Sequence, residues 1–116
     1  MREAGVAVGR RDGVPLLTVR GEHDVSNEQV LRDGLAAALA HGAPVVVDLS
    51  EASFIDSSVL HALAGVSCPG RGEIVVCARS DGLTRRLLEI AGLHEVVQVA
   101  ETVEDALGFA AAEPAR

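Results

Sequence analysis

Three adjacent polar residues, Asp56, Ser57 and Ser58, stand where a strand is expected to give way to a helix. The segment before them, Val45–Leu49, is nearly all apolar, which is typical of a central strand that is covered on both faces. The apolar residues after them repeat at helical spacing, at Leu60, Leu63 and Ala64. Asp and Ser are favoured at the first position of a helix, and the positive end of a helix also favours a phosphate. The segment therefore predicts a switch, at which added charge changes the surface that the protein presents.

A phosphate on Ser57 is expected to act mainly through its charge. It would meet free backbone N–H groups and the positive helix end, which are together worth about 0.3–1 kcal/mol. It would also lie beside the carboxylate of Asp56 and close to Glu22 and Asp24, and it would add about −1.5 to −2 charges. We therefore expect it to repel an acidic or neutral partner surface rather than to reorganise the fold.

Catalysis by these serines is not expected. A hydrolase nucleophile elbow reads Gly-x-Ser-x-Gly, and the sequence from Ile55 to Val59 does not match it. His61 follows Ser57 by one helical turn, and a lone helical histidine is typically a surface residue rather than a base. The turn Gly70-Arg71-Gly72 lacks the Lys and Ser or Thr of a phosphate-binding loop. We predict no catalytic residue, no metal site and no cofactor.

Composition excludes further classes of function. The chain has 116 residues, of which 48% are hydrophobic and 2% aromatic, and its net charge at pH 7 is −7. That length suits one domain with one core, built here from Val, Leu, Ile and Ala. The acidic balance and the absence of Trp and Tyr argue against direct nucleic-acid binding. Cys68 and Cys77 lack metal-site spacing, and Cys77 is expected to be a small apolar filler in a buried strand.

Targeting signals are also missing from the printed sequence. Its first residues lack the apolar stretch of a signal peptide, and no apolar run approaches the length of a membrane span. We expect a cytoplasmic protein that does not insert into membranes.

The order of elements predicts an α/β fold. Asp12-Gly13 is a strong hairpin signal between two short strands, and the later strands alternate with helices, which favours parallel pairing. Ser26 and Gln29 fit a capping box for the first helix, Ser80 or Asp81 can cap the third, and Gly92 suits the position after that helix. The expected strands are 4–9, 14–20, 45–49, 73–78 and 95–99; the expected helices are 27–41, one that begins near Ser57 and ends before Cys68, one with Leu83, Leu87, Leu88 and Ala91 facing inward, and one that opens at Thr102. We expect one domain over residues 1–116, with residues 113–116 fraying.

The chain resembles the STAS domain family, specifically the bacterial anti-sigma factor antagonists. The matching segments cover nearly the whole chain, and their combination is more specific than any one of them. They are Gly21-Glu22-His23-Asp24, Val45 to Ser50, Ser53-Phe54-Ile55-Asp56-Ser57-Ser58, Gly72 to Cys77, Leu83 to Leu88 and Ala91-Gly92-Leu93.

This resemblance implies a mixed sheet with helices largely on one face. It also implies that Ser57, with Ser58 as the second choice, accepts a phosphate from an anti-sigma factor that has serine kinase activity. A phosphatase would reverse the modification, and only the unphosphorylated form would bind the anti-sigma factor and free the sigma factor. The surface implied for the partner consists of Glu22, Asp24, Asp56, Ser57, Ser58, Val59 and His61. We expect a monomer or a weak dimer that is not itself an enzyme.

Two departures from the family pattern leave a second hypothesis open. Val59 stands where the family usually has glycine, and it is expected to add bulk where a kinase would dock. The second helix is also expected to be about one turn shorter than usual. The alternative is an accessory or scaffold subunit of an ABC-type lipid or solute transport complex, in which no phosphorylation cycle is needed.

Overall fold

The computed structural model describes residues 4–42, 44–65 and 74–112. Its elements follow the predicted order of two strands and then alternating helices and strands. The strands are β1 (Gly5–Arg11), β2 (Val14–His23), β3 (Val45–Ile55), β4 (Ile74–Cys77) and β5 (Gln98–Ala100). The helices are α1 (Glu28–Leu39), α2 (Ser57–Gly65), α3 (Leu83–Ile90) and α4 (Val103–Ala112), with short 3-10 turns at Val25–Asn27 and Leu93–Glu95.

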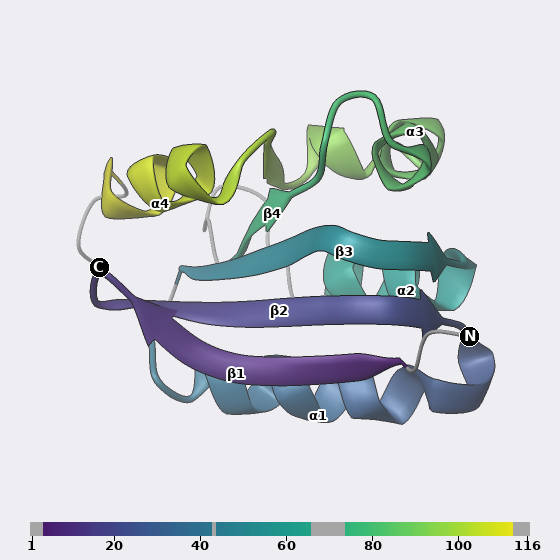
Figure 1. The fold of residues 1–116 in the computed structure, drawn as a ribbon, viewed down its shortest axis with the longest axis horizontal. Helices are drawn as coiled ribbons and strands as arrows, with labels where there is room; N and C mark the ends of the chain where they lie inside the picture. The colour runs from purple at the N-terminus through teal and green to yellow at the C-terminus, as the bar shows by residue number, and fades with distance from the viewer. Residues whose placement is uncertain (1–3, 43, 66–73, 113–116) are drawn as a thin grey trace.

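The described strands form a single mixed sheet of order β1-β2-β3-β4-β5 (Figure 1). β1 and β2 form the predicted antiparallel hairpin, and its turn residues Asp12 and Gly13 have φ of 54° and 80°. Two consecutive positive φ values are typical of the tight turn that Asp-Gly favours. The later neighbours pair in parallel, as the alternation of strands and helices predicts.

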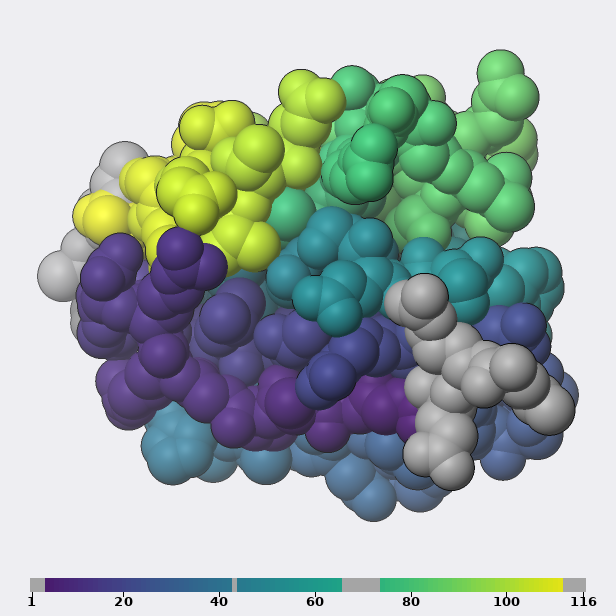
Figure 2. Space-filling view, viewed as in Figure 1, coloured from purple at the N-terminus to yellow at the C-terminus, as the bar shows by residue number. Residues whose placement is uncertain are grey.

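The helices lie largely on one face, which confirms the predicted fold class. Residues from α1, α2 and α3 share one core cluster with the sheet, whereas α4 packs on the opposite face against β3 and β4. Both clusters are aliphatic, as predicted, and Phe54 and Phe109 are each 42% exposed. Figure 2 shows that α4 (yellow) covers only part of its face and leaves parts of β1, β2 and β3 at the surface.

β3 is much longer than predicted. We expected a strand at 45–49 followed by an acidic loop, but the strand continues to Ile55 and pairs with the end of β2. The polar residues Ser50 and Glu51 in its second half favour a loop when only the sequence is considered. In the structure both residues are exposed on the strand. β2 likewise runs through His23, where a break was expected, and its pairing with β3 contains two register shifts, between Thr18 and Arg20 and between Gly21 and Glu22.

The start of the first helix is capped differently from the prediction. The Ser26–Gln29 capping box is wrong, because Asp24 and Asn27 form a capping box around the 3-10 turn Val25–Asn27 that leads into α1, and α1 itself has no side-chain cap. The Asp24 carboxylate accepts from the Ser26 backbone N–H at 2.9 Å, and the Asn27 side-chain oxygen accepts from the Asp24 N–H at 2.9 Å. The cap moves two residues earlier because β2 delivers the chain directly to Asp24.

The second half of the chain follows the prediction in part: on α3 Leu88 is buried, but Leu83 and Ala91, which were expected to face inward, are exposed. Gly92 has φ of 77° immediately after α3, and the Thr102 hydroxyl caps α4 by accepting from the Asp105 N–H at 3.0 Å. The predicted Ser80 or Asp81 cap is wrong, because α3 begins after Gly82, which has no side-chain cap. β5 begins later than expected, because Leu93–Glu95 forms a 3-10 turn.

Cys77 is buried, as predicted, and burial raises the pKa of its thiol to about 12. The remaining sequence predictions fall on residues outside the described ranges, namely Cys68, the Gly70–Gly72 turn, the end of the second helix and the tail at 113–116.

Candidate functional site

The carboxyl ends of β2 and β3 bring together the acidic residues that the sequence singles out. β2 and β3 are parallel neighbours, and Asp24 and Asp56 each follow the last residue of one of them. His23 and Ile55 are partners in the register, so Asp24 and Asp56 leave the sheet at the same place, and the charge of Asp56 raises the pKa of Asp24 slightly against the stronger effects that lower it. Crevices at the carboxyl ends of parallel strands are where open α/β sheets place ligand sites. This acidic cluster, Asp24 and Asp56 with the adjoining Ser57 and Ser58, therefore lies at the end of the sheet where such ligand sites occur.

Asp56 is the capping residue of α2. Its carboxylate oxygen accepts from the backbone N–H of Ser58 at 2.9 Å and from the Ser58 hydroxyl at 2.6 Å. These bonds, with the Ser58 hydroxyl the largest contributor, hold the pKa of Asp56 below its ordinary value. The backbone of Val25 acts in the same direction on the pKa of Asp56.

Asp24 is held in the same way by Ser26. Its carboxylate accepts from the Ser26 hydroxyl at 2.5 Å, and this bond is the largest cause that lowers the pKa of Asp24. Both carboxylates are therefore charged at neutral pH and fixed in place by serines two residues further along the chain.

The two serines of the cluster differ in availability. Ser57 is exposed as the first residue of α2, and within the described part of the chain its hydroxyl has no hydrogen-bond partner. Ser58 is less exposed, and its hydroxyl is engaged with Asp56. A phosphate on Ser58 would remove the bond from its hydroxyl to Asp56, whereas one on Ser57 would break no hydrogen bond of the described structure. This difference favours Ser57 on grounds independent of the family resemblance.

The predicted contact of a phosphate with free helix N–H groups needs a correction. The Ser58 N–H is taken by the Asp56 carboxylate, and the Val59 N–H donates to the Asp56 carbonyl at 3.1 Å. The end of α2 therefore has little left with which to hold a phosphate on Ser57. The added charge would face outward.

Val59 does not belong to the exposed surface. Its side chain is 0% exposed and lies in the core with Ala62 and Leu63. The expectation that Val59 adds bulk at a docking position is therefore wrong. The hypothesis of an accessory transport subunit rested in part on Val59, and the burial of Val59 removes that part of its support.

The other predicted partner residues surround the cluster. Glu22 is exposed near the end of β2 and lies opposite Phe54 in the sheet register. His61 is exposed one helical turn after Ser57. The structure places both near the acidic cluster but shows no hydrogen bond between them and it among the described residues.

Exposed apolar side chains were missed by sequence reasoning. Val25 is 72% exposed, Phe54 is 42% exposed and Leu83 is 58% exposed. Val25 and Phe54 directly adjoin the residues of the acidic cluster in the sequence. The sequence does contain a signal for an exposed apolar side chain, because Val25 stands between the polar residues Asp24 and Ser26.

The bonds to Asp56 predict a specific acid sensitivity. Its pKa is lower in the folded protein than in the unfolded chain, so the unfolded chain binds more protons as pH falls. The stabilisation is present above about pH 4, near the ordinary Asp value, and is lost as pH falls through the folded pKa. The free energy of unfolding in urea should therefore fall less steeply between about pH 5 and pH 2, the range in which carboxyl groups titrate, for Asp56→Asn and Ser58→Ala than for the wild type.

Ser57→Ala is the matched control, because its hydroxyl bonds to neither carboxylate. It should retain the wild-type slope. Equal slopes for all four proteins would contradict the capping role of Asp56.

Two classes of site are not found in the part of the chain that the structure describes. It contains no group of three or more His, Cys, Asp and Glu side chains placed to hold a metal ion. None of its helices is long and apolar enough to cross a membrane.

Comparison with known proteins gives consistent matches over most of the chain. The STAS domain family matches residues 6–106. The anti-sigma-F factor antagonist RsfB of Mycobacterium tuberculosis is 32% identical over 106 residues, which are 88% of this chain and 85% of that protein.

Solved structures agree with the fold. An anti-sigma factor antagonist from Mycobacterium paratuberculosis is 29% identical and has a TM-score of 0.83, with 94% of this chain and 95% of that chain covered. The Bacillus cell fate determinant SpoIIAA in its phosphorylated form has a TM-score of 0.61 at 18% identity, with 90% and 98% covered, and so shows likeness of fold.

Proposed function

The chain belongs to the STAS domain family, and we propose that it is an anti-sigma factor antagonist switched by phosphorylation of Ser57. Such an antagonist is a binding module and not an enzyme. The observation that carries the switch is the free, exposed hydroxyl of Ser57 beside two fixed carboxylates. In the unphosphorylated state the protein binds the anti-sigma factor and so releases the sigma factor.

The partner surface proposed here is the acidic cluster and its apolar border. It consists of Glu22, Asp24, Asp56, Ser57, Ser58 and His61, together with the exposed Val25 and Phe54. Exposed apolar side chains beside polar groups are typical of protein-binding surfaces. Val59 is omitted because its side chain is buried.

The modification is reversible and needs two partner enzymes. The anti-sigma factor, as a serine kinase, supplies ATP, Mg²⁺ and the base. The Ser57 oxygen attacks the γ-phosphorus, the bond from that phosphorus to ADP breaks, and the hydroxyl proton passes to the base of the kinase. A phosphatase removes the phosphate by hydrolysis. The chain itself contributes only the acceptor hydroxyl. Asp56 does not serve as the base, because its carboxylate is already bonded to Ser58.

The phosphate works through repulsion. It adds about −1.5 to −2 charges next to Asp24 and Asp56, and the capped end of α2 does not absorb them. A partner surface that is neutral or acidic then loses affinity. Because sigma factors act on transcription, the proposed location is the cytoplasm, with the protein working as a monomer or weak dimer.

Release of the sigma factor tests this function. Adding the unphosphorylated protein to a complex of the anti-sigma factor with its fluorescently labelled sigma factor should free the label in proportion to the protein added. Fluorescence anisotropy measures the release. Protein phosphorylated on Ser57 should release little. If the unphosphorylated protein leaves the complex intact at saturating concentration, the function is refuted.

A further inference from the structure

β3 extends well beyond its neighbour β4. β4 pairs with β3 only from Val45 to Asp48, whereas β3 continues to Ile55. After Cys77 the chain leaves β3, and the N–H of Ala78 bonds instead to the carbonyl of Ala100 at 2.9 Å. The segment 49–55 of β3 is therefore paired with β2 on one side. Among the described residues, no backbone–backbone hydrogen bond reaches its other edge, and the Ser50 N–H donates to the Asp48 carboxylate at 2.9 Å.

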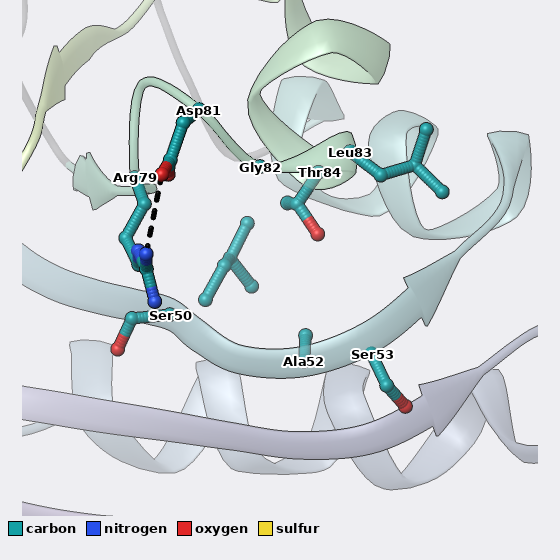
Figure 3. A pocket seen from close by; sticks show the side chains of 9 residues that line it. Ser50, Ala52, Ser53, Arg79, Asp81, Gly82, Leu83 and Thr84 are labelled. Atoms are coloured by element: carbon teal, nitrogen blue, oxygen red, sulfur yellow. Dashed lines mark hydrogen bonds and ion pairs between the residues drawn. The ribbon is translucent and has the colours of Figure 1, made fainter.

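A groove occupies the place where β4 would continue. One wall is the second half of β3, and the other is the turn and first residues of α3. Its volume is about 280 Å³, and it is lined by Leu49, Ser50, Ala52 and Ser53 on β3 and by Arg79, Asp81, Gly82, Leu83 and Thr84 opposite. Figure 3 labels these residues except Leu49.

The groove has the chemistry of a backbone-binding site. Its polar lining is mainly uncharged, with hydroxyls from Ser50, Ser53 and Thr84. Its two charges, on Arg79 and Asp81, form an ion pair with each other at 3.3 Å. An extended peptide satisfies an open strand edge through its own N–H and C=O groups, and it brings no charge that this lining must neutralise.

We propose that an extended, uncharged segment of the anti-sigma factor binds in this groove as an additional strand on the free edge of β3. This proposal rests on the proposed function and names how that partner docks. The segment 49–55 offers about 20 Å of edge at ~3.3 Å per residue, which is enough for a strand of ordinary length.

The wall that α3 forms favours a lone segment over a second copy of this chain. In an edge-to-edge dimer, each copy would have to place its own residues Arg79–Thr84 where the other copy has its groove. A single extended strand lies ~4.8 Å from its neighbour and does not bring such a wall with it.

The same edge leads directly to the switch. β3 ends at Ile55, and Asp56 and Ser57 follow it without a break. A strand bound along β3 would therefore have one end beside the Ser57 hydroxyl. Phosphorylation of Ser57 would act on the bound segment itself and not only on a distant surface.

Filling the groove tests the proposal. Thr84→Trp places a large side chain in the groove, and Arg86→Trp places the same side chain at an exposed position of α3 that does not line it. We expect Thr84→Trp to weaken binding of the anti-sigma factor by about tenfold or more and Arg86→Trp by less than about twofold, as measured by calorimetry. Thermal unfolding of both variants checks that the fold is retained.

Hydrogen–deuterium exchange on the wild type gives a readout that needs no variant. Binding of the anti-sigma factor should slow exchange of amides within 49–55, with the free protein at the same concentration as the reference. A bound anti-sigma factor without this protection overturns the docking mode and leaves the proposed function intact. Protection in the free protein that grows with its concentration also overturns it, because a second copy is then the occupant. Failure of the wild type to bind at all refutes the proposed function instead.

Discussion

Replacing Ser57 with Asp is expected to weaken binding of the anti-sigma factor by about tenfold, and phosphorylation of Ser57 by about a hundredfold. Each tenfold step corresponds to about 1.4 kcal/mol, and unfavourable charge placed at an interface costs on the order of one to several kcal/mol. The aspartate adds one negative charge beside Asp24 and Asp56, whereas the phosphate adds nearly two. Isothermal titration calorimetry with the same anti-sigma factor measures both steps.

The fold should tolerate the Ser57→Asp substitution. Ser57 is exposed and its hydroxyl holds no hydrogen bond within the described structure, so no native contact is lost. A carboxylate in the first turn of a helix is also favoured by about 0.3–1 kcal/mol. Ser57→Asn is the matched control, because asparagine has nearly the same shape as aspartate but no charge. This variant should bind the anti-sigma factor with an affinity within about threefold of the wild type. Equal affinity of the wild type and Ser57→Asp would exclude charge repulsion as the basis of the switch.

The second large effect is expected at His23, whose replacement by leucine should stabilise the protein. His23 is 0% exposed, at a core-facing position that continues the alternation of Leu17 and Val19. Its Nε2 lies 2.9 Å from the carbonyl oxygen of Arg20, which makes Nε2 the donor and leaves Nδ1 as the acceptor. Nδ1 has no partner among the described residues.

A buried polar atom without a partner costs about 1–3 kcal/mol. Leucine removes that atom and keeps the apolar volume, at the loss of one bond to the Arg20 carbonyl. We expect the free energy of unfolding in urea to rise by about 1–2 kcal/mol for His23→Leu. His61→Leu, at an exposed position, should change it by less than about 0.5 kcal/mol. A loss of stability in His23→Leu would mean that the bond to Arg20 outweighs the unpaired nitrogen.

The sequence predicts the order of the elements well, because that order depends on strong local signals. The Asp12-Gly13 turn, the apolar run at Val45–Leu49 and the glycine at Gly92 all act through local backbone preferences. The extension of β3 beyond Leu49 is different, because it depends on β2 continuing beside it. Polar residues such as Ser50 and Glu51 read as a loop when the partner strand is unknown.

The site is predicted in part for the same reason. Asp56 and Ser57 follow from capping preferences and from the family resemblance. The inward face of α2 was predicted one residue out of phase, with Leu60, Leu63 and Ala64 inward, whereas the buried residues are Val59, Ala62 and Leu63. Both sets have helical spacing, so apolar periodicity alone does not choose between them. The phase depends on the cap at Asp56, and it decides that Val59 is a core residue.

The free edge of β3 has no signature in the sequence. It exists because β4 pairs only as far as Cys77 while β3 runs on to Ile55. The relative lengths of two neighbouring strands are set by tertiary packing, which a single sequence does not report.

Phosphate incorporation tests the central claim, that Ser57 is the acceptor of the switch, most directly. The wild type, Ser57→Ala and Ser58→Ala are each incubated with the anti-sigma kinase, ATP and Mg²⁺, and their intact masses are measured. The account predicts that the wild type and Ser58→Ala each gain one phosphate and that Ser57→Ala gains none. An undiminished gain in Ser57→Ala, or no gain in the wild type, would contradict it.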